Sequence, residues 1–191
     1  MRNFFLGAIA VVILIIIIGY IGVVTGTLIP ANADAQPGTL ERWAAHQSLD
    51  AAVARGAPTS PPPVAADAAT FNEGIKIYGG SCIVCHGGAD GPSTVGFGLY
   101  QRAPLLGRHG VEDDPVGQTY WRVRHGIRLT GMPAFANTLT DPQIWQVALF
   151  LKRTDKLPPA SEVKWKALKN PAALVPLDKL PPQMRRAISS D

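Results

Sequence analysis

The stretch Cys82-Ile83-Val84-Cys85-His86 constrains this chain more than any other part of its sequence. Two thiols three residues apart can each add to one vinyl group of a haem, and the histidine that follows is then placed under the iron. The pattern C-x-x-C-H therefore indicates a c-type haem attachment site. A domain built on such a site folds around its cofactor, which supplies much of the core.

The cysteine content narrows the alternatives. Cys82 and Cys85 are the only cysteines in 191 residues, so no further thiolate is left to complete a structural zinc or iron–sulfur site. A redox-active C-x-x-C of the thioredoxin type needs a βαβ pattern nearby, whereas a glycine-rich loop follows this motif. A chance match with a solvent-exposed histidine is the remaining alternative. We expect one covalently bound haem c.

Residues 4–24 form an uncharged apolar run that could continue to Ile29. This is enough to cross a hydrocarbon core of about 30 Å at about 1.5 Å per residue. We expect an uncleaved transmembrane anchor over residues 1–29, because the apolar core of a secretory signal is shorter, about 7–15 residues. A cleaved signal is the alternative, since the small-x-small stretches 31–33 and 33–35 look like cleavage sites. Arg2 is the one charged side chain before the run. The weak positive-inside bias that it gives leaves the N-terminus in the cytoplasm and the remainder of the chain outside.

Residues 30–66 are predicted to be a Pro- and Ala-rich tether. Within residues 39–55 several side chains recur at roughly helical spacing, namely Leu40, Trp43, Gln47 and Ala51. We expect a short amphipathic helix there, with Thr39 as its N-cap. Trp43 would lie in the headgroup region, against a partner subunit, or on the globular part of this chain. The prolines at 61–63 should be extended and stiff.

Residues 67–155 are predicted to form an all-α haem domain of about three helices. Asp67 is a plausible N-cap for a first helix that ends near Cys82 and whose apolar residues have spacings of four and three, namely Phe71, Ile75 and Tyr78. A second helix is expected over 117–125, and a third starts at Asp141 with Pro142 at its first turn. No segment alternates convincingly, which argues against strands.

Several short motifs follow one another through this domain: Phe71-Asn-Glu-Gly74-Ile-Lys-Ile-Tyr78, Cys82-x-x-Cys85-His86-Gly87, Ala103-Pro104-Leu105-Leu106-Gly107, His125-Gly126-Ile127, Gly131-Met132-Pro133-Ala134-Phe135 and Leu139-Thr140-Asp141. In this order they resemble the class I monohaem cytochromes c, most of all the haem-c modules of bacterial respiratory oxidase and dehydrogenase subunits. The resemblance covers nearly all of residues 67–155 and none of the remainder. It implies a cytochrome c-like fold on the outer side of a bacterial inner membrane.

The resemblance also implies the site residues. Cys82 and Cys85 would form the thioether bonds, His86 would be the proximal ligand of the iron, and Met132 the distal ligand. The alternative for Met132 is a buried gap-filler in the core. The carbonyl of Pro104 would accept the Nδ1–H of His86, which fixes the tautomer of the ring. A plain loop proline is the alternative there.

Further positions are matched with less specificity. Gly74 and Phe150 correspond to the family's crossing of the first and last helices. Tyr120, Trp121 and Arg124 could donate hydrogen bonds to haem propionates, since buried carboxylates need charged or polar partners; plain core packing is the alternative for the two aromatic residues. A bis-histidine site would use one of the haem-domain histidines, His109 or His125. The long loop 87–103 could shape the exposed haem edge or contact a partner.

The basic excess of the chain lies in its last segment. Residues 156–191 carry seven basic and three acidic side chains, while residues 1–66 and 67–155 are each balanced. The high isoelectric point therefore argues neither for a basic docking face on the haem domain nor for nucleic-acid binding. We interpret 156–191 as a Pro-rich extension with at most a turn or two of helix at 161–169. It is either solvated or an arm on a partner subunit or on the domain's own surface.

These observations predict a membrane-anchored electron carrier rather than an enzyme. Its partners would be redox proteins: a quinol-oxidising complex or dehydrogenase as donor, and an oxidase or photosynthetic reaction centre as acceptor. One alternative is a fixed haem c subunit of a larger respiratory, dehydrogenase or photosynthetic complex. The other is a haem peroxidase or ligand sensor, for which the sequence supplies no distal acid–base group.

Overall fold

The computed structural model describes residues 1–28, 31–107 and 111–173. Its internal contacts divide the chain into two units, Met1–Gln36 and Pro37–Asp191. Within the described ranges all regular secondary structure is helical, and the only β-type pairings are two isolated bridges. The prediction of an all-α fold is confirmed for this part of the chain.

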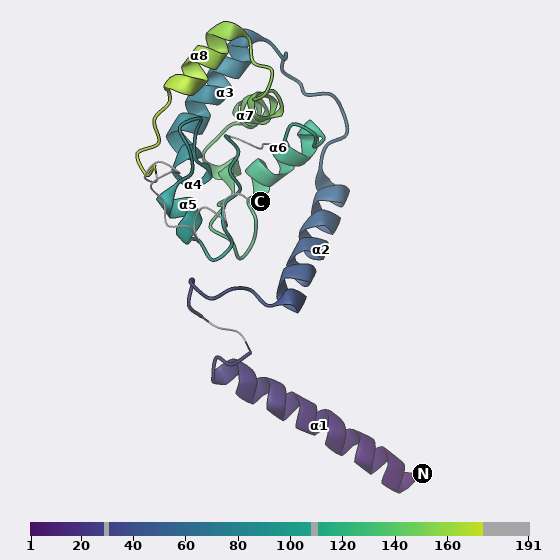
Figure 1. Cartoon of the computed structure of the whole chain (residues 1–191). Helices are drawn as coiled ribbons and strands as arrows, with labels where there is room; N and C mark the ends of the chain where they lie inside the picture. The colour runs from purple at the N-terminus through teal and green to yellow at the C-terminus, as the bar shows by residue number, and fades with distance from the viewer. Residues whose placement is uncertain (29–30, 108–110, 174–191) are drawn as a thin grey trace. The chain divides into compact units, whose positions relative to one another are not determined.

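The first unit contains one helix, α1 (Arg2–Val24), drawn in purple in Figure 1. Its stretch Asn3–Val24 is long and apolar enough to cross a membrane, as the sequence predicts. A signal sequence near an N-terminus has the same length and composition. The helix is therefore a candidate span, and its retention in the mature protein stays a prediction.

The second unit is built on the crossing of α3 (Ala68–Ser81) with α7 (Asp141–Lys152). The helix α3 begins as predicted, because the Asp67 side chain accepts a hydrogen bond from the backbone N–H of Thr70 at 2.9 Å. Gly74 lies at the crossing, where any side chain would collide with the Gln146 carbonyl and lie 2.7 Å from Phe150 Cβ. The predicted close approach of the two helices is confirmed.

A second pair of helices adjoins this crossing through α6, which packs on α7. The predicted helices at 39–55 and 117–125 are present as α2 (Thr39–Gly56) and α6 (Val116–His125), and they pack on each other. The predicted cap of α2 is wrong: Gly38 is the N-cap, and Thr39 is already helical. Trp43 is 62% exposed, so it does not pack on the globular part of this chain.

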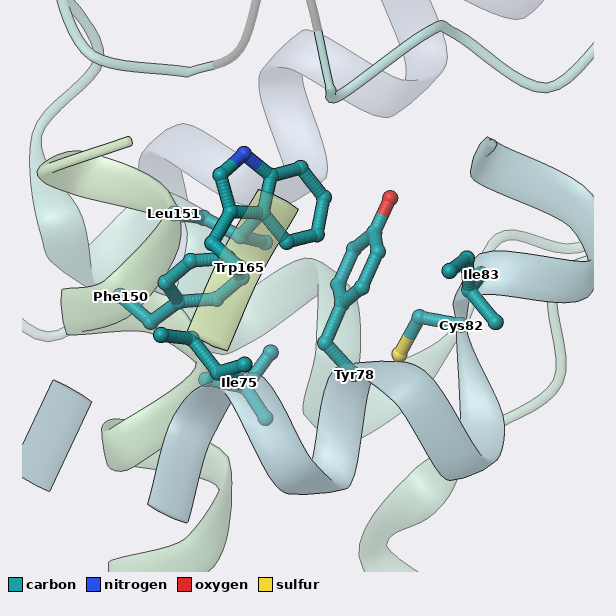
Figure 2. Packing of buried hydrophobic residues seen from close by; sticks show 8 residues of the cluster. Ile75, Tyr78, Cys82, Ile83, Phe150, Leu151 and Trp165 are labelled. Atoms are coloured by element: carbon teal, nitrogen blue, oxygen red, sulfur yellow. The ribbon is translucent and has the colours of Figure 1, made fainter. Parts of the chain in front are cut away.

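The helix α8 (Pro159–Ala167) adds the last core residue. Trp165 is only 4% exposed and packs edge-on against Tyr78 and Phe150, with ring centres 5.3 Å and 5.2 Å away. Figure 2 shows Tyr78 of α3 between this aromatic pair and Cys82. The described part of the C-terminal extension is therefore packed on the domain's own helices. The domain boundaries predicted at residues 66 and 155 stay predictions, and the packing of helices crosses both.

Short elements complete the second unit: α4 (Ile83–His86), α5 (Thr94–Gly98) and the 3₁₀ turn η1 (Phe135–Asn137). The segment after α8 returns to the start of α5. Ala172 O accepts a hydrogen bond from Thr94 N at 2.9 Å, and Asp90 Oδ2 accepts one from Asn170 N at 3.3 Å. This strap ties residues 170–173 to the loop that follows α4.

Candidate haem site

The two cysteines and the histidine of the C-x-x-C-H motif share one tight turn. The helix α3 ends at Cys82, whose carbonyl accepts hydrogen bonds from the N–H groups of Cys85 at 3.1 Å and His86 at 2.9 Å. Gly87 closes the turn with a φ of 71°, in the left-handed region that favours glycine. Backbone hydrogen bonds thus fix the three side chains relative to one another.

Tyr78 reinforces this turn from inside the core. Its hydroxyl donates a 2.7 Å hydrogen bond to the carbonyl of Gly87, and its side chain is fully buried. Burial raises the pKa of Tyr78 far above its usual value, with a smaller contribution from Cys82. The phenol therefore stays protonated and remains a donor to the end of the turn.

The thiols of Cys82 and Cys85 are not joined in a disulfide. Burial raises the pKa of Cys82 to about 12, and the neighbouring Cys85 adds to the effect. A redox-active dithiol of the thioredoxin type needs a lowered thiol pKa, because the thiolate is the nucleophile. The environment of Cys82 disfavours that alternative.

His86 is oriented by the backbone of a distant loop. Its Nδ1 lies 2.9 Å from the carbonyl oxygen of Pro104. Burial lowers the pKa of His86, and the hydrogen bond to Pro104 opposes that shift. A neutral imidazole that donates from Nδ1 keeps the lone pair of Nε2 free for a metal.

A cavity of about 750 Å³ opens beside this turn. Its walls come from the attachment turn, from the loop before and after Pro104, from the loop around Met132, and from α7. Most of the lining side chains are apolar, among them Leu99, Leu106, Val123, Ile127, Phe135, Val147 and Leu151.

Met132 lines the same cavity, although it is far from the attachment motif in the sequence. Two hydrogen bonds close its loop: Ile127 N donates to the Met132 carbonyl at 3.2 Å, and Met132 N donates to the Thr130 side-chain hydroxyl at 3.1 Å. Gly126 opens the loop with a φ of 64°, and a side chain there would lie 2.6 Å from the Pro133 backbone. The loop therefore needs glycine at this position.

These residues fit a covalently attached haem. Two free thiols, an imidazole with a free Nε2 and a thioether line one cavity of apolar character, and a haem c uses this donor set. In residues 1–28, 31–107 and 111–173 no group of three or more His, Cys, Asp or Glu side chains could hold a metal ion instead. The donor set therefore favours haem over a zinc site.

The three residues predicted to contact propionates do not line the cavity. Tyr120 is buried and stacks on Trp145 with ring centres 4.1 Å apart. Arg124 donates to the Tyr120 hydroxyl at 3.1 Å and pairs with Asp141, and the Tyr120 hydrogen bond leads the causes that raise the pKa of Arg124. Trp121 lies against Gly56 of α2. For these residues the propionate role stays a prediction, and the contacts of Tyr120 and Trp121 favour the packing alternative given for them.

The bis-histidine alternative would need His109 or His125 to reach the cavity. His125 is exposed, its ring centre lies 4.9 Å from that of Trp121, and it does not line the cavity. His109 lies outside the described residues. Among the described residues His86 is the histidine that lines the cavity.

Part of the long loop 87–103 forms one wall of the cavity, in line with one of the two roles open to it in the sequence. The loop 99–103, whose role was open, contributes Leu99, Gln101, Arg102 and Ala103. These residues immediately precede Pro104 in the chain. A residue predicted to hold the proximal histidine was thus a signal that its neighbours would face the cofactor too.

Comparison with known proteins agrees with this site. The family described as "Cytochrome C oxidase, cbb3-type, subunit III" matches residues 69–151. The cytochrome c6 of Thermosynechococcus vestitus is 34% identical over 87 residues, which are 46% of this chain and 72% of the relative. The cytochrome c6 of Parathermosynechococcus lividus is 32% identical over 83 residues, 44% of this chain and 88% of the relative. No solved structure gives a significant match.

The matched residues contain the attachment turn, the Pro104 loop and the Met132 loop, so the similarity includes every segment that forms the cavity. The cytochromes of this type carry haem c bound covalently through a C-x-x-C-H motif. The chain belongs to the cytochrome c family as a class I monohaem c-type cytochrome with covalently bound haem c and a role in electron transport.

Proposed function

We propose that this protein carries single electrons through a haem c whose iron is bound by His86 and Met132, with thioether bonds from Cys82 and Cys85. One observation carries the proposal: His86 and Met132 come from segments far apart in the sequence and line one cavity. The hydrogen bond between His86 Nδ1 and the Pro104 carbonyl supports it, because it leaves Nε2 free to bind the iron.

When bound, the haem supplies a one-electron couple. His86 donates from a neutral ring in one orientation, and the soft neutral thioether of Met132 favours the reduced iron. If His86 and Met132 both bind the iron, this chain would leave no coordination site for a substrate. The mostly apolar lining disfavours ordered water beside the iron. These roles suit electron transfer to a docked partner and not the chemistry of a peroxidase or ligand sensor.

The ligand proposal is tested by the near-infrared spectrum of the ferric holoprotein. We expect a methionine–iron charge-transfer band in the wild type and in Met184→Ala, and its loss in Met132→Ala. Met184→Ala is the matched control because it also removes one methionine. A wild type without the band, or a band that survives in Met132→Ala, would refute the ligand set. Carbon monoxide binding by the wild-type ferrous protein at neutral pH would favour the sensor or peroxidase alternative.

We further propose that residues 1–29 anchor the protein in a bacterial inner membrane, that 30–66 form a tether, and that 67–155 carry the haem in the periplasm with 156–191 as an extension. The apolar helix α1 supports the anchor. Mass spectrometry of the purified chain tests its retention, since cleavage would give a mature N-terminus within residues 31–36. Protease treatment of intact spheroplasts tests the side, because only a periplasmic haem domain would be released.

Two kinds of association are compatible with this site. The relatives named cytochrome c6 favour a carrier that docks transiently on partner redox proteins. The family description as a subunit of a cbb3-type cytochrome c oxidase favours a fixed haem subunit. Purification of the full chain in mild detergent separates them. Stoichiometric co-purifying subunits would establish the fixed subunit, and a lone haem protein that re-oxidises with added membranes would establish the carrier.

A further inference from the structure

Among the described residues that line the cavity, a single side chain carries a permanent charge. Of the residues that line it, only Arg102 is a cation at every accessible pH. The other titratable lining residues are Tyr78, Cys82, Cys85 and His86. Tyr78 stays protonated, the two thiols are consumed by attachment, and His86 is the proposed iron ligand. Arg102 therefore dominates the charge of the cavity wall.

Arg102 is held at the opening of the cavity. Its residue is exposed and at the same time lines the cavity, which places it where the cavity meets solvent. Its guanidinium carbon lies 4.3 Å from the centre of the Phe97 ring of α5, a cation–π contact that limits its orientations. Gln101 beside it also lines the cavity and adds an amide donor.

A haem brings propionate carboxylates into this cavity, and a carboxylate close to an apolar wall needs a charged or hydrogen-bonding partner. A guanidinium fork matches a carboxylate in shape as well as in charge. We propose that Arg102, with Gln101 beside it, binds a haem propionate and raises the reduction potential by compensating the negative charge. Arg102 is thus a positioning residue, and this inference rests on the haem attached at Cys82 and Cys85 within the proposed function.

The competing cation is Arg124, which the sequence motifs favoured. Its guanidinium is already engaged by the Tyr120 hydroxyl and by Asp141, and it does not line the cavity. Arg102 has only the Phe97 ring as a recorded partner among the described residues. A propionate bound by Arg102 and a propionate bound by Arg124 therefore predict opposite results in the same experiment.

The experiment is a redox titration of the full-length holoprotein in mild detergent between pH 5 and pH 8. A propionate paired with Arg102 is ionised throughout this range, so this propionate should add no pH dependence to the wild-type midpoint potential. In Arg102→Gln the propionate pKa rises into the range, and each ionisation then favours the ferric form. We expect a new region in which the potential falls with pH, and a shift of about three- to tenfold toward the ferric form at pH 8.

Three further variants make the result specific. Arg102→Lys keeps the charge and should largely restore the wild-type profile. Arg128→Gln removes the same charge from an exposed residue that does not line the cavity, and should leave the shape of the profile unchanged. Arg124→Gln should also leave the shape unchanged.

A profile of Arg102→Gln that runs parallel to the wild type would overturn the inference, and so would a new pH-dependent region in Arg124→Gln. The near-infrared band recorded on the same samples keeps the two proposals apart. Absence of the band in the wild type refutes the His86/Met132 ligand set whatever Arg102→Gln does. A parallel Arg102→Gln profile in a protein that shows the band refutes only the role of Arg102.

Discussion

The two sides of the cavity are built in different ways. On one side the turn 78–87 is closed by hydrogen bonds between residues close in sequence, and its tyrosine donor is fully buried. On the other side the hydrogen bonds of the loop 126–135 join Ile127, Thr130 and Met132, none of which is fully buried, and Leu129 within the loop is 89% exposed with a φ of 62°. A positive φ is strained for a leucine.

This difference predicts which side of the haem site should lose its structure first. The histidine side is preorganised by its own backbone and by packing on α3, and it is the side where covalent attachment occurs. The methionine side depends on one exposed loop. A substitution that weakens the methionine loop should therefore release Met132 from the iron while the haem stays attached. A substitution that weakens the histidine turn should lower the stability of the whole domain.

The largest effect is expected from Cys82→Ala with Cys85→Ala, which prevents attachment. The cavity of about 750 Å³ would lose its occupant, and its apolar walls would be exposed. We expect loss of the cooperative thermal transition in circular dichroism, and hence of a folding free energy on the order of 5–15 kcal/mol. Met132→Ala should keep both the haem and a cooperative transition. A double-alanine variant that melts like the wild type would contradict this dependence.

Gly126→Ala tests the methionine side. Its backbone, with φ 64° and ψ −171°, lies in a region that glycine alone adopts readily and costs an alanine about 1–3 kcal/mol, and a Cβ there would lie 2.6 Å from the Pro133 backbone. We expect the charge-transfer band to weaken or disappear while the haem remains attached. Gly98→Ala is the control, because a Cβ at that position meets nothing within 4 Å. If Gly126→Ala kept the full band, the loop would not position Met132.

Tyr78→Phe tests the histidine side. It leaves the Gly87 carbonyl without its buried donor, which should cost about 1–3 kcal/mol of global stability. Guanidinium unfolding followed by circular dichroism measures this loss, and the charge-transfer band should persist in the folded protein. Tyr100→Phe, which removes an exposed 2.6 Å hydrogen bond to Glu41, should have a smaller effect. Equal losses in the two variants would show that Tyr78 has no special role.

Thr130→Val should have the smallest effect. The Thr130 hydroxyl donates to Ile127 O at 2.7 Å and accepts from Met132 N at 3.1 Å. Its loss should weaken the loop by about 1 kcal/mol, seen as a lower temperature at which the charge-transfer band disappears, with the global transition nearly unchanged. Thr138→Val serves as control because its hydroxyl makes one exposed hydrogen bond, to Phe135 O. Equal shifts of both transitions would argue that the loop and the domain unfold together.

Much of the helical framework was predictable because its signals are local. Asp67 as a cap, Pro142 in a first turn and the spacing of Phe71, Ile75 and Tyr78 are properties of short windows. The cap of α2 was missed because Gly38 has no side chain to signal its role. The helix α8 was predicted as only a turn or two, because it is short and its core contact comes from one residue, Trp165.

The haem site also has one part that local sequence determines and one part that tertiary packing determines. The attachment motif needs only one turn of chain, so Cys82, Cys85 and His86 are placed together by hydrogen bonds within five residues of sequence. The charge that faces the cavity depends instead on which loop closes over it. Arg124 and Arg102 are alike as letters, and folding directs the first to Tyr120 and Asp141 and the second to the cavity wall. The sequence by itself determines the covalent attachment site, because its residues are neighbours in the chain. The electrostatic environment of the haem is decided by the tertiary structure, because it comes from segments that meet only when the helices pack.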